Sequence, residues 1–166
     1  MNTIKMVIFD VDGVFSDGKI VVNSDGIESK NFYVQDGTGI TYLQRAGIKT
    51  AIISGRKSKV VEYRAKELSI DDVFLGVQRK IEAYETLLEK YKLDDHETCY
   101  IGDDLIDLPV LRRVGFSVAV PNARQEVKEC ASYVTVADGG HGAIREVVEK
   151  ILKSQGKWES IIEKYY

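Results

Sequence analysis

Two aspartates stand where the first apolar run of the chain stops. The run MVIF leads into Asp10, and Asp12 follows two positions later, just before Gly13. A carboxylate can attack phosphorus as a nucleophile, and a second carboxylate beside it can donate and accept protons. Residues two apart on a strand point to the same face, about 6.6 Å apart, so this spacing lets one substrate meet both side chains. The structural alternative is a turn or a helix cap, where an aspartate is common.

Further residues with polar side chains, or with an accessible backbone in the case of glycine, follow later apolar runs in the same manner, and they are Ser54, Gly55, Arg56, Arg79, Lys80, Asp103, Asp104 and Asp107. Each one alone has an ordinary explanation as a loop residue, a helix start or a cap. Together they would bring several carboxylates to one place, and carboxylates at close range need a cation. Clustered oxygen ligands select a hard cation, and Mg²⁺ accepts a few carboxylates together with water and phosphate.

The elements that must position these residues alternate along the chain. Near-continuous apolar runs favour strands buried on both faces, at residues 5–11, 49–55, 71–76, 98–104, 116–121 and 132–138. Between them, apolar residues at helical spacing predict helices, at residues 79–91, 105–114 and 142–155. The alternation predicts an α/β fold with a doubly wound, Rossmann-like, mostly parallel sheet. Ligands of such sheets bind beyond the carboxyl ends of the strands.

One segment interrupts this rhythm directly after the opening motif. Residues 17–34 hold two extended stretches around NSDG, which predicts an inserted β-hairpin with its turn near Asp25 and Gly26. The hairpin would overhang the end of the first strand, either as a flap over a site or as an edge decoration. We expect a single domain over residues 1–166. Residues 157–166 would form a C-terminal tail with a small amphipathic helix, packed on its own domain or on a neighbouring subunit.

Composition and charge argue against several classes of protein. The formal net charge is −3, with both signs spread along the chain, so neither nucleic-acid binding nor strong membrane attraction is expected. No apolar segment approaches the roughly 20 residues that span a bilayer, and no signal peptide is recognised before the first run. Cys99 and Cys130 form no CxxC motif, which indicates reduced packing residues. We therefore expect a soluble, cytoplasmic protein.

The ordered motifs resemble those of the haloacid dehalogenase superfamily of phosphatases. They are DVDG, ISG, a lysine that opens a helix, and GDDLID, at residues 10–13, 53–55, 80 and 102–107. The resemblance spans most of the chain. It implies that Asp10 is the nucleophile and forms an aspartyl phosphate, while Asp12 protonates the leaving group and then deprotonates the attacking water. It also implies that Mg²⁺ is held by the Asp10 carboxylate, the Asp12 backbone carbonyl and Asp103.

The same resemblance implies roles for the remaining motif residues. Ser54 and the backbone of Gly55 would bind phosphoryl oxygens, and Lys80 would neutralise charge on the phosphoryl group and on the nucleophile. Asp104 or Asp107 would orient Lys80 or a metal-bound water. Members of the superfamily differ mainly in their caps. The short intervals between the motifs leave no room for a helical cap domain, so the chain is similar to the capless members.

Within that group the chain resembles the 3-deoxy-D-manno-octulosonate 8-phosphate phosphatase family, through DGVFSDGKI, VQDGTGI, ISGRKS and GGHGAIRE. The resemblance implies an Mg²⁺-dependent phosphoric monoester hydrolase that releases 3-deoxy-D-manno-octulosonate (KDO) and inorganic phosphate, in KDO and lipopolysaccharide biosynthesis. It implies a homotetramer whose hairpins join at the centre and whose subunits help to cover one another's sites. It also implicates the loop of Asp36 and Gly37. Arginine suits the carboxylate of such a sugar-acid phosphate, and the arginines in or near the second and third motifs are Arg56, Arg64 and Arg79.

Three alternatives remain at this point. A phosphatase for nine-carbon sialic-acid-type 9-phosphates (KDN or N-acylneuraminate 9-phosphate) shares the scaffold, but that group carries an acidic residue where this chain has Arg56. A receiver-like signalling domain also has an acidic Mg²⁺ pocket, but its phosphorylated aspartate ends the third strand, and here the third run ends in FLG. An inactive regulatory subunit is disfavoured by the intact motif set. The sequence leaves the metal open among Mg²⁺, Co²⁺ and Mn²⁺, and also the neighbouring residues that would close the site.

Overall fold

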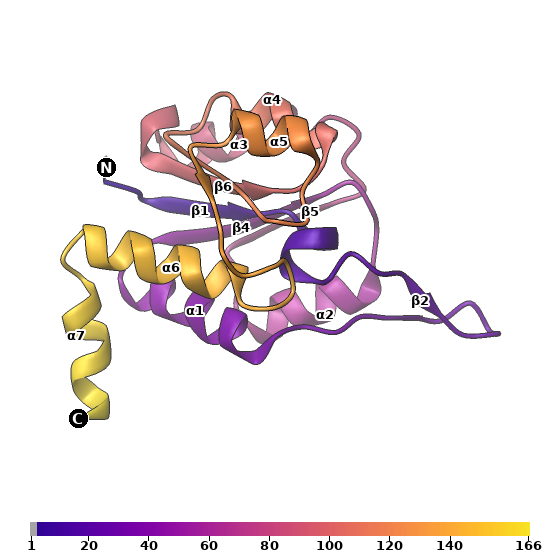
Figure 1. The fold of residues 1–166 in the computed structure, drawn as a ribbon, viewed down its shortest axis with the longest axis horizontal. Coiled ribbons are helices and arrows are strands. Elements are labelled where there is room, and N and C mark those ends of the chain that lie inside the picture. The colour runs from indigo at the N-terminus through magenta and orange to yellow at the C-terminus, as the bar shows by residue number, and fades with distance from the viewer. Residues whose placement is uncertain (1–2) are drawn as a thin grey trace.

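A six-stranded sheet forms the centre of the computed structural model, which describes residues 3–166 (Figure 1). The strands lie in the order β5-β4-β1-β6-β7-β8. Their bounds are β1 Met6–Phe9, β4 Lys49–Ser54, β5 Asp72–Leu75, β6 Thr98–Gly102, β7 Phe116–Ala119 and β8 Tyr133–Val134. Every neighbouring pair in this sheet is parallel. The predicted α/β, doubly wound sheet is therefore confirmed.

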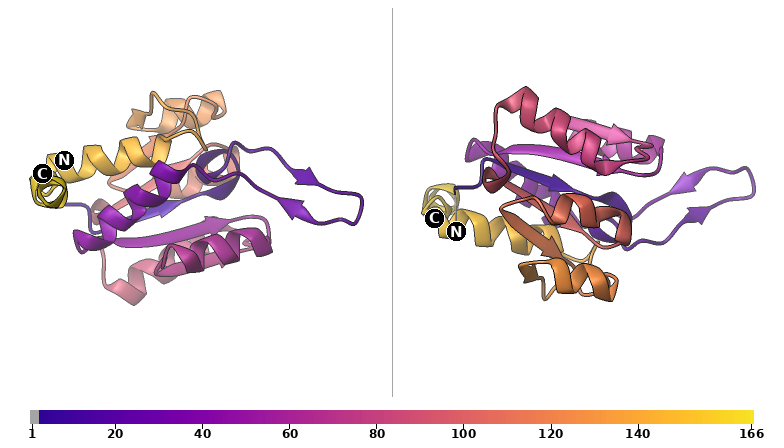
Figure 2. Two further views of the ribbon diagram at one scale, coloured as in Figure 1. Left: turned by 90° about the horizontal axis from the view of Figure 1, so that it is seen from below. Right: turned by 90° about the horizontal axis from the view of Figure 1, so that it is seen from above.

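Helices cover both faces of the sheet (Figures 1 and 2). One face carries α1 Val34–Arg45, α2 Lys59–Glu67 and α6 Ala143–Ser154, and the other carries α3 Lys80–Tyr91, α4 Leu108–Leu111 and α5 Gln125–Cys130. Helix α6 buries the apolar stripe that its sequence predicts, namely Ile144, Val147, Val148, Ile151 and Leu152. Because α6 packs against α1, the last long helix of the chain closes the core beneath β1.

Strand β1 lies inside the sheet, between β4 and β6. All four of its side chains are fully buried, as expected for a run of large apolar residues between two helical layers. Its last residue, Phe9, is in register with Ile52 of β4 on one side and with Ile101 of β6 on the other. The strand order reverses around β1, and ligands of doubly wound sheets bind at such a reversal. The segments that follow these three strands therefore emerge side by side.

The predicted hairpin is present and extends away from the sheet (Figure 2). Strands β2 Val21–Val22 and β3 Glu28–Ser29 pair antiparallel. Gly26 turns between them with φ +76°, a backbone conformation that favours glycine, and its N–H donates to the carbonyl oxygen of Asn23. The turn near Asp25 and Gly26 is thus confirmed.

Three local expectations were wrong. Strand β1 ends at Phe9, and the chain then turns tightly over Val11–Phe15 with Gly13 at φ +92°, so Asp10 and Asp12 do not share a strand. The helix expected at residues 105–114 is only a turn, Leu105–Asp107, followed by the one-turn helix α4, because two aspartates cap the turn with their side chains. Strands β5 and β8 lie at the sheet edges and are only partly buried.

The C-terminal tail packs on its own chain. Helix α7 Trp158–Ile162 buries Ile161, and the Trp158 ring stands edge-on to Tyr42 of α1, with 6.0 Å between ring centroids. Figure 1 shows this helix at the end of the molecule opposite the hairpin. Within residues 3–166, none of the helices has the length and apolar character that a membrane span requires.

Candidate active site

Three carboxylates meet where β1 and β6 end. Asp10 follows β1, while Asp103 and Asp107 follow β6, and one oxygen from each lies within 4.8 Å of the other two. The parallel register explains this meeting, because the strands end at the same level. The apolar core surrounds the cluster from below, so these charges are poorly hydrated. The structure therefore brings together residues that lie far apart in the sequence.

Lys80 is the cation of this cluster. It opens α3, its side chain is only 1% exposed, and its Nζ lies 2.8 Å from Asp10 Oδ1 and 2.7 Å from Asp107 Oδ1. Burial alone would lower the pKa of Lys80, but the charges of Asp10 and Asp107 outweigh it and raise that pKa. Lys80 is thus held as an ammonium ion against Asp10, as the sequence-based role requires.

Asp107 is saturated by hydrogen bonds. Its Oδ1 accepts from Lys80 and from the hydroxyl of Tyr100 at 2.6 Å, and its Oδ2 accepts from the backbone N–H groups of Asp103 and Asp104. With four donors already bound, Asp107 orients Lys80 and the loop after β6. Asp104 points elsewhere, because its carboxylate caps the turn that begins at Leu105. Tyr100 is a site residue that the sequence did not indicate, since it reads as one more apolar strand position.

The three carboxylates of the cluster carry more negative charge than Lys80 alone can neutralise. Burial, and then the charge of Asp107, raise the pKa of Asp10 to about 6. Burial, and then the charge of Asp10, raise the pKa of Asp103 to about 8. The buried Oδ1 of Asp103 accepts no hydrogen bond from the described residues. An unpaired buried carboxylate oxygen beside a second carboxylate fits a divalent cation.

Gly13 leaves the space that the Asp103 carboxylate occupies. A Cβ atom at this position would lie 2.1 Å from Asp103 Oδ2, so any side chain would displace the carboxylate. The loop is held in place by Asn122, whose amide donates to the carbonyl oxygen of Gly13 and whose Oδ1 accepts from the N–H of Gly139. Sequence reasoning did not identify Asn122, because its partners lie in two distant loops.

The end of β4 supplies the predicted phosphate loop. Ser54 is buried at 3% exposure, and its Oγ accepts a hydrogen bond from the N–H of Arg56 at 3.4 Å. Gly55 follows it, and a Cβ atom added there would make only ordinary van der Waals contacts, with Ile106 and Val77. Since β4 neighbours β1, Ser54 and Gly55 stand beside Asp10 in the same edge of the sheet.

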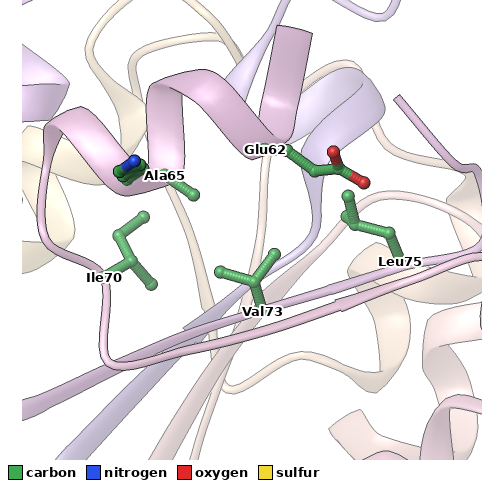
Figure 3. A pocket seen from close by; sticks show the side chains of 6 residues that line it. Glu62, Ala65, Ile70, Val73 and Leu75 are labelled. Carbon is green, nitrogen blue, oxygen red and sulfur yellow. The ribbon is translucent and has the colours of Figure 1, made fainter. Parts of the chain in front are cut away.

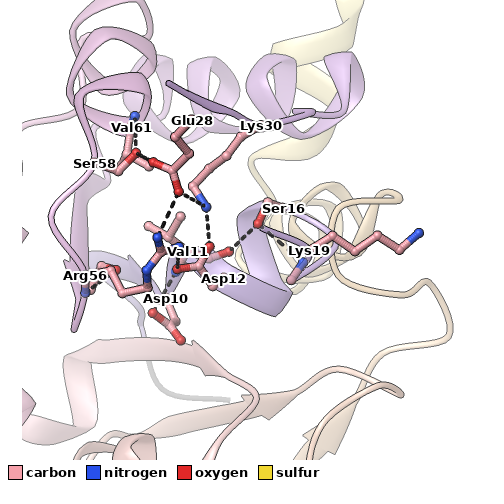
Figure 4. Close-up of polar contacts among 12 residues, drawn as sticks. Asp10, Val11, Asp12, Ser16, Lys19, Glu28, Lys30, Arg56, Ser58 and Val61 are labelled. Carbon is pink, nitrogen blue, oxygen red and sulfur yellow. Dashed lines mark hydrogen bonds and ion pairs between the residues drawn. The ribbon is translucent and has the colours of Figure 1, made fainter. Parts of the chain in front are cut away.

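Asp12 faces the hairpin (Figure 4). Lys30 forms an ion pair with Asp12 Oδ1, and Arg56 Nη1 lies 3.5 Å from Asp12 Oδ2. Glu28 joins the group, because its carboxylate lies 3.1 Å from Arg56 and accepts a hydrogen bond from the Ser58 hydroxyl. Lys30 and Glu28 were not identified from the sequence. Their spacing of two along the second arm of the hairpin was the available signal, since such residues share a face.

Four predicted ligands lie outside the acidic cluster. Asp36 is fully buried and caps α6, where its carboxylate accepts hydrogen bonds from the N–H groups of Gly142 and Arg145. Gly37 packs against Arg64, the next of the four. Arg64 lies on α2, pairs with Glu67 and covers the ring of Phe32. Arg79 is 71% exposed and pairs with Glu82.

A hollow of about 540 Å³ lies at the outer edge of the sheet (Figure 3). It is formed between α2 and the edge strand β5, and it is lined by Glu62, Ala65, Lys66, Ile70, Val73 and Leu75. Glu62 and Lys66 are charged, and the other side chains of the lining are apolar. The lining includes none of Asp10, Asp103 and Asp107, so the hollow is separate from the acidic cluster.

The geometry suits transfer of a phosphoryl group. A buried carboxylate, a buried ammonium ion, an unpaired oxygen of Asp103 and a polar loop lie together at the end of β1. Such fixed charges stabilise the charge that develops on a phosphoryl group.

Comparison with known proteins supports this interpretation. The family model for haloacid dehalogenase-like hydrolases matches residues 76–147. The 3-deoxy-D-manno-octulosonate 8-phosphate phosphatase of Escherichia coli K12 is 46% identical over 156 residues, which are 94% of this chain and 83% of that protein.

Solved structures of relatives agree in fold. The Moraxella catarrhalis 3-deoxy-D-manno-octulosonate 8-phosphate phosphatase, in complex with magnesium, phosphate and KDO, is 44% identical with a TM-score of 0.96, covering 98% of this chain and 94% of that one. The Haemophilus influenzae phosphatase, in its cobalt-bound form, is 41% identical with a TM-score of 0.91, covering 94% of this chain and 91% of that one.

Proposed function

The chain belongs to the haloacid dehalogenase superfamily and, within it, to the 3-deoxy-D-manno-octulosonate 8-phosphate phosphatase family, and on that premise we propose that it hydrolyses this sugar-acid phosphate to KDO and inorganic phosphate. The observation that carries the proposal is the buried Lys80 between Asp10 and Asp107, with the unpaired oxygen of Asp103 beside them. This arrangement has little structural value without an anionic substrate and a cation.

The reaction proceeds through an aspartyl phosphate. The Asp10 carboxylate attacks phosphorus, the bond from phosphorus to the sugar oxygen breaks, and its electron pair stays on that oxygen, which takes a proton from Asp12. A water molecule then gives a proton to Asp12, and its oxygen attacks phosphorus. The bond from phosphorus to Asp10 breaks with its electron pair on the carboxylate, which is thereby restored, and inorganic phosphate is released. Lys80, Ser54 and the backbone of Gly55 hold the phosphoryl oxygens during both steps.

Mg²⁺ is the cofactor that fits this donor set. The Asp10 carboxylate, the backbone carbonyl of Asp12 and the Asp103 carboxylate would hold it, because Asp107 is already saturated by four donors. When bound, Mg²⁺ neutralises charge on the phosphoryl group and on the nucleophile. Asp107 keeps Lys80 aimed at Asp10.

Arg56 favours the eight-carbon substrate over nine-carbon sialic-acid-type 9-phosphates. It lies two residues beyond Ser54 and faces the open side of the site, where it pairs with Asp12 and Glu28. Its fork can bind both oxygens of a substrate carboxylate. A phosphatase of the nine-carbon group would carry an acidic residue there. Arg64 and Arg79 remain weaker proposals, because both have acidic partners away from the cluster.

The assembly and the location are part of the same proposal. Four apolar side chains of the hairpin are more than half exposed, namely Ile20, Val21, Val22 and Ile27, and such a patch suits burial between subunits of a homotetramer. Light scattering that returns the mass of one chain would contradict this assembly. Cys99 and Cys130 are unbridged, which suits the reducing cytoplasm.

The direct test compares two substrates with the purified protein. We expect the specificity constant for 3-deoxy-D-manno-octulosonate 8-phosphate to exceed that for N-acylneuraminate 9-phosphate by at least about tenfold, since a changed carboxylate contact is worth at least 1.4 kcal/mol. A chelator should abolish turnover, and added Mg²⁺, Co²⁺ or Mn²⁺ should restore it to different extents. A preference for the nine-carbon compound would overturn the assignment.

A further inference from the structure

Lys30 is a buried lysine that no catalytic motif contains. It lies on the second arm of the hairpin, one residue beyond β3, and its side chain is 1% exposed. Its Nζ pairs with Asp12 Oδ1 and lies 3.2 Å from Glu28 Oε1 (Figure 4). A buried ammonium ion is stable only where it is paired. The position of Lys30 is therefore fixed by two carboxylates, one from the loop that carries Asp12 and one from the same arm of the hairpin.

The carboxylate of Asp12 depends on these contacts. Among residues 3–166, its ion-pair partners are Lys30 and, at 3.5 Å, Arg56. No hydrogen bond from the surrounding loop reaches it, whereas the neighbouring Asp10 is held by the N–H of Val11. The side chain of Asp12 is also 24% exposed, so apolar packing does not hold it. Its orientation is therefore set by Lys30 of the hairpin, together with Arg56 of the loop after β4.

The other end of this contact is anchored to α2. Glu28 accepts the hydroxyl of Ser58 at 2.6 Å, and Ser58 is the N-terminal cap of α2. Glu28 also lies 3.1 Å from Arg56. Lys30 is thus linked through Glu28 and Ser58 to the start of α2. The base of the hairpin therefore forms one side of the site.

We propose that Lys30 is a positioning residue for phosphoryl transfer, which holds the Asp12 carboxyl group where the leaving oxygen departs. The inference rests on the proposed function. In the first step the proton moves from Asp12 to the sugar oxygen as the phosphorus–oxygen bond breaks, and Asp12 becomes the carboxylate that pairs with Lys30. In the second step the same carboxylate, still held by Lys30, takes a proton from water.

A positioning role for Lys30 predicts unequal losses of activity on two kinds of substrate, whereas general damage to the fold would lower both activities alike. An alkyl phosphate needs a proton on its leaving oxygen, whereas p-nitrophenyl phosphate releases a stable anion that needs none. The ratio kcat/KM reports the steps up to transfer of the phosphoryl group to Asp10, so slow hydrolysis of the intermediate does not obscure it. Loss of the positioning should therefore weaken kcat/KM for the sugar-acid phosphate much more than for the aryl phosphate.

The experiment measures kcat/KM for both substrates in the wild type, in Lys30→Met and in Lys19→Met. Lys19 is the matched control, because it lies on the same hairpin, its side chain is 79% exposed, and within residues 3–166 its ion-pair partner is Asp17 alone. For Lys30→Met we expect a loss of roughly 10- to 100-fold on 3-deoxy-D-manno-octulosonate 8-phosphate and less than about threefold on p-nitrophenyl phosphate, as for a misplaced general acid. Lys19→Met should match the wild type.

Two outcomes would overturn the role of Lys30 without touching the proposed function. In the first, Lys30→Met loses kcat/KM equally on both substrates. In the second, it loses kcat/KM on neither. Both outcomes require that the wild-type enzyme is active. A wild type that hydrolyses the aryl phosphate but not the sugar-acid phosphate would instead refute the substrate assignment. Should Lys30→Met fail to fold, Lys30→Arg allows the same comparison, because it keeps the charge but displaces it. The same unequal loss is then expected, and an equal loss on the two substrates overturns the inference.

Discussion

At the scale of single residues, the site is short of positive charge. Asp10, Asp103 and Asp107 meet around one lysine, and one oxygen of Asp103 has no partner among the described residues. Burial and crowding raise the pKa values of Asp10 and Asp103, to about 6 and about 8. Shifts of this kind, produced by burial and a specific charged neighbour, are typical of functional sites.

The first prediction concerns pH and metal together. In the metal-free protein the pKa of Asp103 is about 8 against an ordinary 3.8, so between these values the folded chain keeps a proton that the unfolded chain has released. This group therefore makes the metal-free protein less stable as pH rises through that window. Mg²⁺ needs the deprotonated carboxylate, so its stabilising effect on the unfolding temperature should grow from about pH 6 to about pH 8.5.

Asp103→Asn is the control for this experiment. It should remove most of the Mg²⁺-induced shift in unfolding temperature and flatten the dependence on pH, because the amide neither titrates nor attracts the cation. Thermal unfolding scans with and without Mg²⁺ provide the measurement. A metal response in Asp103→Asn equal to that of the wild type would exclude Asp103 as a ligand.

At the scale of elements, the site depends on helix α6, although α6 contributes no catalytic group. Its first turn is held by Asp36 of α1, through the N–H groups of Gly142 and Arg145. The segment just before α6 packs on the catalytic loop, where a Cβ on Gly139 would lie 1.7 Å from the carbonyl oxygen of Gly13. The cap therefore connects two helices to the loop that carries Asp12.

Asp36→Ala should lower the free energy of unfolding by about 2 to 3 kcal/mol, because it removes a cap and leaves two backbone N–H groups without their partner. Urea denaturation measures the change. Asp25→Ala is the matched control at the exposed hairpin turn, where the carboxylate makes none of the described hydrogen bonds and the cost should be below about 0.5 kcal/mol. Equal costs for the two variants would remove the capping role.

The elements that could be predicted from sequence are those whose signal is local. The stripe of α6, the run of β1 and the turn at Gly26 are readable from spacing and residue type. The end of β1 was not, because it depends on the turn at Gly13. The role of Asp36 was not either, since its partners lie more than a hundred positions later and no local pattern connects them.

At the scale of the whole molecule, the fold brings four distant segments to one point. The ends of β1, β4 and β6 and the start of α3 place Asp10, Ser54, Asp103 and Lys80 together. This meeting was predictable, because parallel strands end at a common edge. The pairing of Asp12 with Lys30 was not, since it depends on the direction in which the hairpin leaves the sheet (Figure 2).

The claim that most of this account depends on is that Asp10 becomes phosphorylated during turnover. The measurement is to quench the enzyme during turnover of the sugar-acid phosphate, reduce it with borohydride, which converts an aspartyl phosphate to homoserine, and map the modified residue by mass spectrometry. We predict homoserine at position 10 in the wild type, and neither homoserine nor phosphatase activity in a folded Asp10→Asn variant, since an amide is a poor nucleophile. Rapid turnover without modification, or modification at another aspartate, would contradict the account.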